Sequence, residues 1–399
     1  MEYVQRGTKA FRQINLALFV GGFVTFANLY CTQPLLPVFS KEFHLSPTVS
    51  SLSLSVTTTA LAIFMLVAGS LSEAFGRKSV MAVSMVGTSL LSLLAAGAPN
   101  FPLLLVARIM QGIVLAGLPA IAMAYLAEEV DTKSLGVAMG LYISGNSIGG
   151  MAGRIIIGMV TSASSWRTAL LVIGVISVVC SLIFVYVLPA SRNFTSRPLQ
   201  LTSLVGTMWH HLHDIGLLYL FLIGFMLMGG FVTFFNYIGY LLTGTPYHLS
   251  QAIAGWIFVI YITGTFSSTF MGRLADRCGR RRVMWIAITI MLLGGLITLI
   301  PTIYTVILGA GVFTFGFFGA HSLASSWVGR RATSEHAQAS ALYLFFYYVG
   351  SSIGGTSGGE LWTLMNWPGI IAMITVMLII ALYLAHRLSA LYPKQLRVK

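Results

Sequence analysis

Charge is scarce in this sequence. Asp, Glu, Lys and Arg together make up only 8% of its 399 residues, whereas a soluble domain carries about 25%. Hydrophobic residues make up 57%, and the mean hydropathy is +0.87. Too few polar side chains remain to cover a globule in water, so the composition disfavours a soluble protein and indicates an integral membrane protein.

Residues suited to metal, redox or catalytic chemistry are also few. The three cysteines, Cys31, Cys180 and Cys278, show no spacing typical of a metal site or a disulfide framework. The sequence has no Walker-type phosphate loop, which argues against an ATP-driven pump. It also has no nucleophile elbow or zinc-binding spacing that would indicate an enzyme. We therefore expect no catalytic residues, no metal and no cofactor.

What the sequence does contain is a series of long apolar runs. A helix needs about 20 mostly apolar residues to cross a bilayer, and lipid offers no partner to an open backbone group. The pattern therefore predicts an all-α membrane protein with twelve transmembrane helices, the first of them retained rather than removed as a signal peptide. The predicted helices are 14–38, 49–72, 79–97, 101–127, 135–161, 168–189, 215–242, 251–272, 283–301, 303–328, 339–364 and 367–386.

The basic residues between these runs predict the orientation. If the N-terminus is cytoplasmic, the outside segments contain only Lys41 and Arg167, and Arg108 and Arg154 lie inside spans. The remaining Lys and Arg residues are then cytoplasmic, which favours both termini inside. We attribute the net charge of +13 to this orientation rather than to nucleic acid, and we expect a bacterial cytoplasmic membrane protein.

Two motifs occur twice, about 200 residues apart. "GSLSEAFGRK" (69–78) is echoed by "GRLADRCGRR" (272–281), and "GNSIGG" (145–150) returns as "GSSIGG" (350–355). Parallel repeats of this kind are typical of transporters that hold the substrate between two halves. The predicted parts are a six-helix half at 1–189, a cytoplasmic central loop at 190–214, and a second six-helix half with a short tail at 215–399.

These motifs identify a resemblance to the major facilitator superfamily over essentially the whole chain. The two charged stretches resemble its signature after the second helix and the copy after the eighth. "RIMQG" (108–112) and "GNSIGG" resemble motifs of its drug/proton antiporter branch, with Asn146 where Pro is usual, and "CTQPLLP" (31–37) resembles its first-helix signature. The resemblance implies two pseudo-symmetric halves and transport by alternating access.

The resemblance also implies that the charged stretches form a latch, which joins the halves on the cytoplasmic side and stabilises the outward-facing state. Glu73, which stands where Asp is usual, and Asp276 can accept charge-assisted hydrogen bonds or face a helix N-terminus. The glycines permit close helix approach and a sharp turn. The alternative is a pair of ordinary positive-inside loops. The expected latch residues are Gly69, Glu73, Gly76, Arg77, Lys78, Gly272, Asp276, Gly279, Arg280 and Arg281.

Charged residues inside a membrane are costly and need an explanation. Arg108 either serves proton coupling or anion contact, or is a structural arginine bound to helix-end carbonyls. Arg154 and Glu360 either have a function or snorkel to the outer interface. The "GNSIGG" glycines are expected to let the fifth and eighth helices approach, or to bend the fifth. The expected coupling or gating residues are Arg108, Gly112, Gly145, Asn146, Gly149, Gly150 and Glu360.

Three acids, Glu128, Glu129 and Asp131, lie at the inner end of the fourth predicted helix, where capping and function are equally open. Further polar residues lie on or near the cavity faces implied by the family, and with many aromatics they suit an amphipathic organic molecule. His321 among them can titrate near neutral pH or simply pack. The expected cavity residues are Asn28, Tyr30, Gln33, Gln111, Asn236, Tyr237 and His321.

The function predicted from these features is export of a small organic compound by proton antiport. Uptake by proton symport is the first alternative, and a non-transporting membrane sensor is the second. The expected partners are a small-molecule substrate, protons as coupling ion and the lipid bilayer. We expect a monomer that binds no nucleic acid.

Overall fold

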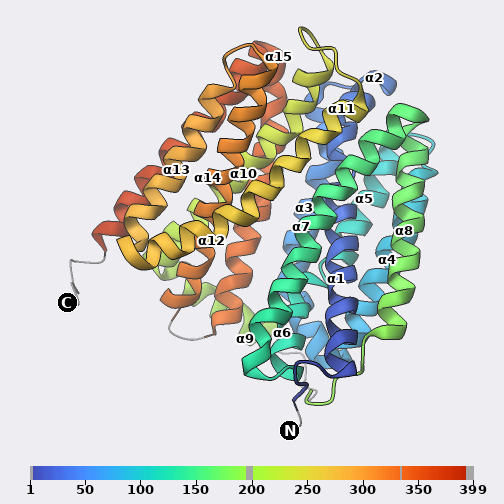
Figure 1. Cartoon of the computed structure of the whole chain (residues 1–399), viewed down its shortest axis with the longest axis vertical. Helices are drawn as coiled ribbons and strands as arrows, with labels where there is room; N and C mark the ends of the chain where they lie inside the picture. The colour runs from blue at the N-terminus through green and yellow to red at the C-terminus, as the bar shows by residue number, and fades with distance from the viewer. Residues whose placement is uncertain (1–2, 195–200, 333–334, 392–399) are drawn as a thin grey trace. The chain divides into compact units, whose positions relative to one another are not determined.

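The computed structural model describes residues 3–194, 201–332 and 335–391, with the backbone alone at 201–205. Residues 195–200 of the predicted central loop and 392–399 of the predicted tail lie outside the described residues. The chain divides into two compact units. Figure 1 traces the helices of both, which we describe separately.

The first unit contains residues 1–45, 49–201 and 248–258. Several helices begin at a side chain that accepts a backbone N–H, such as Thr8 for α1, Asn100 for α5 and Ser165 for α8. Its helices are α1 (Lys9–Tyr30), η1 (Gln33–Leu35), α2 (Leu36–Glu42), α3 (Pro47–Phe75), α4 (Arg77–Ala96), α5 (Phe101–Leu115), α6 (Pro119–Glu129), α7 (Thr132–Ala163), α8 (Trp166–Val187) and α11 (Gln251–Gly255).

The second unit contains residues 46–48, 202–247 and 259–399. Asn366, with φ 53° and ψ −141°, breaks its longest helix into two spans, shortly before Pro368. Its helices are α9 (Leu201–His213), α10 (Ile215–Thr243), α12 (Tyr261–Cys278), α13 (Arg280–Ile297), α14 (Ile303–Arg331) and α15 (His336–Ala390). The short helix η2 (Trp256–Ile260) spans the boundary between the units, with only its last two residues in the second.

These helices confirm the predicted all-α membrane fold. The described residues form twelve helical spans at the predicted positions, counting α1 with η1 and α2 as one, α5 with α6 as one, α11 with η2 and α12 as one, and α15 as two, and leaving α9 out. Nine described helices, α15 among them, are apolar and long enough to cross a membrane. The prediction missed α9, which lies inside the segment expected to be a loop.

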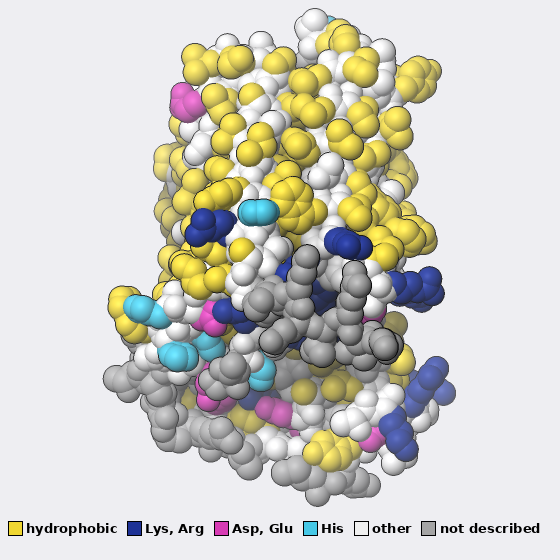
Figure 2. Space-filling model, turned by 90° about the vertical axis from the view of Figure 1, so that its left-hand side faces the viewer, with side chains coloured by type: hydrophobic (Ala, Val, Ile, Leu, Met, Phe, Trp, Pro, Cys, Tyr) yellow, Lys and Arg dark blue, Asp and Glu magenta, His cyan; other side chains and the backbone are white. Residues whose placement is uncertain are grey.

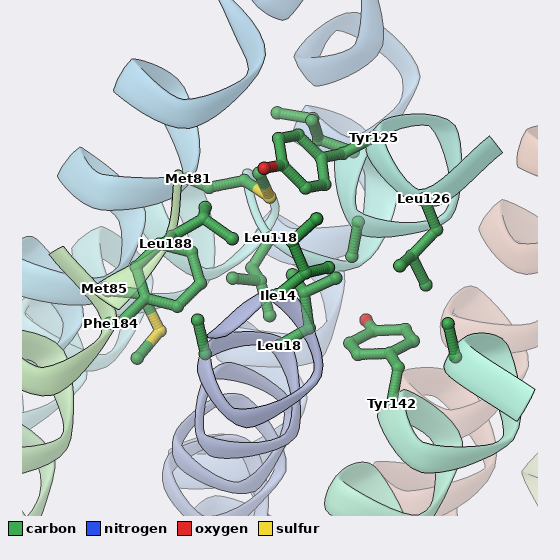
Figure 3. Close-up of a cluster of buried hydrophobic side chains, with 14 of the residues drawn as sticks. Ile14, Leu18, Met81, Met85, Leu118, Tyr125, Leu126, Tyr142, Phe184 and Leu188 are labelled. Atoms are coloured by element: carbon green, nitrogen blue, oxygen red, sulfur yellow. The ribbon is translucent and has the colours of Figure 1, made fainter. Parts of the chain in front are cut away.

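A hydrophobic cluster closes one end of the first unit. Figure 3 shows Ile14 and Leu18 of α1 beside Leu118, with Met85 and Phe184 from α4 and α8. The cluster is almost completely buried, since each of these five side chains is at most 1% exposed. It holds four helices, α4, α6, α7 and α8, around α1, because interior packing at crystal-like density leaves them little freedom.

Glycines bring α7 into close contact with α1. A Cβ built on Gly145 would lie 2.3 Å from the Phe19 carbonyl oxygen, and one on Gly149 would lie 2.2 Å from that of Phe23. The expectation that these glycines face the eighth span is therefore wrong. Gly158, two turns further along α7, is the glycine that approaches α11, with the Gln251 carbonyl oxygen 2.8 Å from its built Cβ.

The second unit repeats this arrangement. A Cβ on Gly350 of α15 would lie 2.2 Å from the Phe225 carbonyl oxygen, and one on Gly354 would lie 2.9 Å from Gly229. Both copies of the glycine motif thus join the first and fifth spans of their own unit. Small residues allow this approach in a membrane, where helix association depends on packing rather than on the hydrophobic effect. α7 is helical throughout, so Asn146 introduces no break.

We predict that Gly149→Ala destabilises the protein, because the added methyl group has to displace the α1 backbone. Overpacking of this kind costs about 1–3 kcal/mol, which should lower the thermal midpoint of the purified protein by several degrees. Gly140→Ala in the same helix is the matched control, since a Cβ there meets nothing within 4 Å. Equal midpoints for the two variants would contradict the close α1–α7 contact.

Candidate functional site

The first charged motif turns the chain at Gly76, whose φ of +91° favours glycine. Arg77 follows at the start of α4, is only 7% exposed, and donates from Nη2 to Glu128 Oε1 (2.7 Å) and from Nε to Glu128 Oε2 (3.2 Å). This is a bidentate ion pair, the strongest geometry that arginine makes with a carboxylate. It ties α4 to the end of α6.

Glu128 is the acid that pairs with Arg77, whereas the sequence alone leaves its role open between capping and function. The motif pointed to Glu73, but the Glu73 carboxylate, near the end of α3, lies 3.7 Å from Arg77 Nη2, outside hydrogen-bond distance. The neighbouring Glu129 is 2% exposed and accepts the backbone N–H groups of Arg192 and Asn193 at 2.7 and 2.9 Å. Glu128 therefore binds Arg77, and Glu129 binds the backbone at the start of the predicted central loop.

The second motif makes the same turn but different contacts. Gly279 has φ +86°, and Arg280 Nη1 donates to Ser326 Oγ at 3.0 Å. A Cβ on Gly69 or on Gly272 would meet no described atom within 4 Å. Close helix approach at those two glycines is therefore not observed among the described residues.

A second ion pair lies at the start of α10. Arg331 Nε donates to Asp214 Oδ1 at 2.7 Å, and the same oxygen accepts the N–H groups of Gly216 and Leu217. Burial alone would raise the pKa of the Asp214 carboxyl, but these hydrogen bonds and the guanidinium charge outweigh it and hold that pKa below its usual range. Neither residue was expected from the sequence.

Arg108 of α5 lies at the centre of a buried polar network in the first unit. Its side chain is completely buried. It donates to the carbonyl oxygens of Asn28 (2.9 Å) and Leu29 (2.8 Å) at the end of α1, and to that of Ser53 in α3 (3.0 Å). It also donates to Gln111 Oε1. Each of these partners is a carbonyl oxygen rather than a carboxylate.

These contacts match the second alternative for Arg108, a structural arginine bound to helix-end carbonyls. The last carbonyls of a helix lack partners within the helix and carry the negative end of its dipole, so a guanidinium there caps α1. Gln111 extends the network, donating to Asn28 Oδ1 at 3.2 Å, and Asn28 Nδ2 donates to Ser177 Oγ of α8 at 2.7 Å. Gly112 packs against the Thr57 carbonyl of α3. The network positions Asn28 and Gln111, two of the predicted cavity residues.

Arg154 of α7 forms a second buried cationic cluster. It is 2% exposed, which decides against the snorkelling alternative. Its guanidinium carbon lies 4.2 Å from the centre of the Tyr30 ring and 5.0 Å from that of Phe258, and Nε donates to Gln33 Oε1 at 2.7 Å. Cation–π contacts strengthen when they are removed from water. Tyr30 and Gln33, also predicted for the cavity, lie in this cluster.

Glu360 occupies the corresponding region of the second unit but is exposed. Thr48 Oγ1 donates to its Oε1 at 3.1 Å, and a Cβ on the adjacent Gly359 would lie 2.4 Å from the Thr48 Cα. Its exposure fits the interfacial alternative.

Where the first unit has Arg108, the repeat places Phe313 in the second. Phe313 stacks on Phe234 with ring centres 4.3 Å apart, and Phe231 stacks on Phe317 at 3.7 Å. One turn beyond Phe317, His321 Nδ1 lies 2.9 Å from the Tyr343 hydroxyl. The second unit therefore has an aromatic interior with one histidine–tyrosine pair.

The other two predicted cavity residues are deeply buried. Asn236 and Tyr237 of α10 have 0% exposure, and the Tyr237 hydroxyl donates to the Gly355 carbonyl oxygen at 2.8 Å. His321 is only half-buried. A substrate role for these residues remains a prediction.

Comparison with known proteins agrees with this architecture. The Major Facilitator Superfamily model matches residues 18–246 and 233–397. The chain is 53% identical over 389 residues to the MFS-type transporter YybF of Bacillus subtilis, covering 98% of this chain and 96% of that protein. It is 46% identical over 387 residues to the inner membrane transport protein YnfM of Escherichia coli, covering 97% of this chain and 93% of that protein.

Among solved structures, a bacterial homologue of the human lysosomal transporter Spinster, in an inward-facing and occupied conformation, has a TM-score of 0.77. It has 15% identity and covers 97% of this chain and 98% of the other. The helices and their repeat define a multi-pass membrane transporter of two six-helix units. The chain belongs to the major facilitator superfamily, as the sequence motifs predicted.

We predict that Arg108→Gln lowers thermal stability, because several buried carbonyl oxygens lose their donor at about 1–3 kcal/mol each. The control is Arg167→Gln, which removes the exposed pair with Glu42 and should cost less than about 1 kcal/mol. Thermal midpoints in detergent measure both. An unchanged midpoint in Arg108→Gln would contradict the capping role.

We also predict that Glu128→Gln destabilises the protein more than Glu73→Gln. Each substitution removes one negative charge, but only Glu128 makes a bidentate pair with Arg77. A double-mutant cycle with Arg77→Gln should give a coupling energy of about 1–2 kcal/mol for Glu128. A larger coupling for Glu73 would show that the motif acid, not Glu128, is the partner of the arginine.

Proposed function

We propose that this transporter exports a small amphipathic organic compound in exchange for protons. The observation that carries the proposal is the convergence of two antiporter-type motifs on α1. Arg108 and Gln111 bind the end of that helix, while Gly145 and Gly149 pack on its middle. A shift of α1 would therefore act on both motifs at once.

The chemistry of the two units supports an amphipathic substrate. The first unit offers amide groups at Asn28 and Gln111, with a cation behind them, and the second offers stacked phenyl rings. Pockets for drug-sized molecules combine apolar walls with a few placed polar groups. We therefore propose both sets of side chains as substrate contacts.

Proton coupling needs a group that titrates, and we propose His321. An arginine holds its proton throughout the physiological range, so Arg108 and Arg154 act by charge and position. Glu360 is exposed, whereas His321 is half-buried among Tyr343, Tyr347 and Phe317, with ring centres 5.7, 4.6 and 5.9 Å away. Histidine is the side chain suited to exchange a proton near neutral pH. The Tyr343 hydroxyl lies 2.9 Å from His321 Nδ1.

Gating in the proposed cycle uses the charged stretches. We propose that these stretches, with Arg77 and Asp276, act on the cytoplasmic side. We expect the working unit to be a monomer in the bacterial cytoplasmic membrane.

The coupling is testable in everted membrane vesicles with an acidic interior, followed by an acridine dye that reports the pH gradient. Addition of a substrate should release protons and restore the dye fluorescence. Dyes, antibiotics, sugars and organic acids form the panel. We predict that His321→Asn abolishes proton release but retains substrate exchange at equal pH. His213→Asn, an exposed histidine on α9, is the control.

Two results would contradict the proposal. Substrate movement that ignores the imposed gradient in the wild type would rule out proton antiport. Normal proton release in His321→Asn would rule out His321 as the carrier and leave antiport itself intact.

A further inference from the structure

A basic hollow opens on the surface of the second unit, where α13 begins and α15 ends. Its volume is about 480 Å³, and it is lined by Arg281, Arg282, Trp285, Ile286 and Ser389. None of these five residues was predicted to bind substrate, although Arg281 belongs to the expected latch. None of its lining residues belongs to the polar network around Arg108 or to the aromatic interior with His321.

The lining combines two cations with an apolar wall. Trp285 is 38% exposed and Ile286 is 44% exposed, and the Trp285 ring meets the His386 ring edge to face, with centres 6.1 Å apart. The five lining residues include no carboxylate. Such a surface favours a ligand that is anionic at one end and apolar at the other.

The hollow lies where α13 passes from charged to apolar sequence. α13 begins with three arginines and continues "VMWIAITIMLL". Figure 2 shows the side of the molecule on which α13 lies in Figure 1: hydrophobic side chains cover its upper part, and Lys, Arg and His gather in its lower half together with Asp and Glu. This boundary is the position at which lipid headgroups meet acyl chains, and tryptophan is enriched there.

We propose that this hollow binds the headgroup of an anionic phospholipid on the side predicted to be cytoplasmic. Arg281 and Arg282 donate to the phosphodiester oxygens, since the guanidinium fork matches phosphate geometry. Trp285 and Ile286 contact the glycerol and the first part of the acyl chains. Basic pockets between helices on the cytoplasmic face of membrane proteins suit such headgroups.

The test is native mass spectrometry of the full-length protein in neutral detergent, with phosphatidylglycerol or phosphatidylcholine added. We expect the wild type to retain phosphatidylglycerol in preference to phosphatidylcholine. Arg282→Gln should weaken this retention about fivefold, the effect of one basic residue at a lipid surface. The matched control is Arg277→Gln, which removes the same charge from an exposed position of α12 outside the hollow.

Trp285→Leu is a second variant that leaves the charge unchanged, and it should also weaken retention of phosphatidylglycerol. Thermal midpoints confirm that each variant is folded before lipid is added. The site is disproved if phosphatidylcholine is retained equally, or if Arg277→Gln weakens retention as much as Arg282→Gln. Displacement of the lipid by an equal concentration of inorganic phosphate would show a site for free phosphate instead. Lipid retention is read without transport, so it is independent of the proposed antiport.

Discussion

The structure depends on one constraint: inside a bilayer, a polar group must find its partner within the protein. The end of α1 shows what this requires. Its last carbonyl groups have no partners within the helix, and the completely buried Arg108 supplies their donors. The same guanidinium reaches Ser53 and Gln111, so one side chain joins three helices and holds the Gln111 amide, which in turn binds the Asn28 amide. The motif that contains it is therefore a part of the scaffold as well as of the proposed substrate path.

The two units solve this constraint differently, although they share a repeat. Both join their first and fifth spans through glycines, at Gly149 against Phe23 and at Gly350 against Phe225. The repeat conserves backbone packing, which tolerates only glycine at these contacts. It does not conserve the interior, where a buried guanidinium in one unit corresponds to the stacked Phe313 in the other. This asymmetry gives one unit a polar interior and the other an aromatic one.

Much of this could be predicted from the sequence. The twelve spans, the repeat and the superfamily follow from apolar runs and from motifs whose glycines and charges have a physical reason to be there. Which side chains contact one another across different helices could not be predicted. Arg77 pairs with Glu128, which is distant in sequence, rather than with the motif acid Glu73, because that pairing depends on where α6 ends. Likewise, the spacing of Gly145 and Gly149 defines a face of α7 but does not say which helix covers it. The burial of Arg154 could not be predicted for the same reason, since the rings that cover it, Tyr30 and Phe258, come from separate segments.

Export is the central claim, and the most direct measurement is compound accumulation in bacteria that lack their main efflux systems. Cells expressing the wild-type transporter are compared with cells expressing Asp276→Asn, with equal membrane insertion verified, across dyes, antibiotics, sugars and organic acids. The proposed function predicts that the wild type lowers the accumulation of at least one amphipathic compound and that Asp276→Asn loses this effect. Raised accumulation of a compound in the wild type would contradict it and assign the chain to uptake.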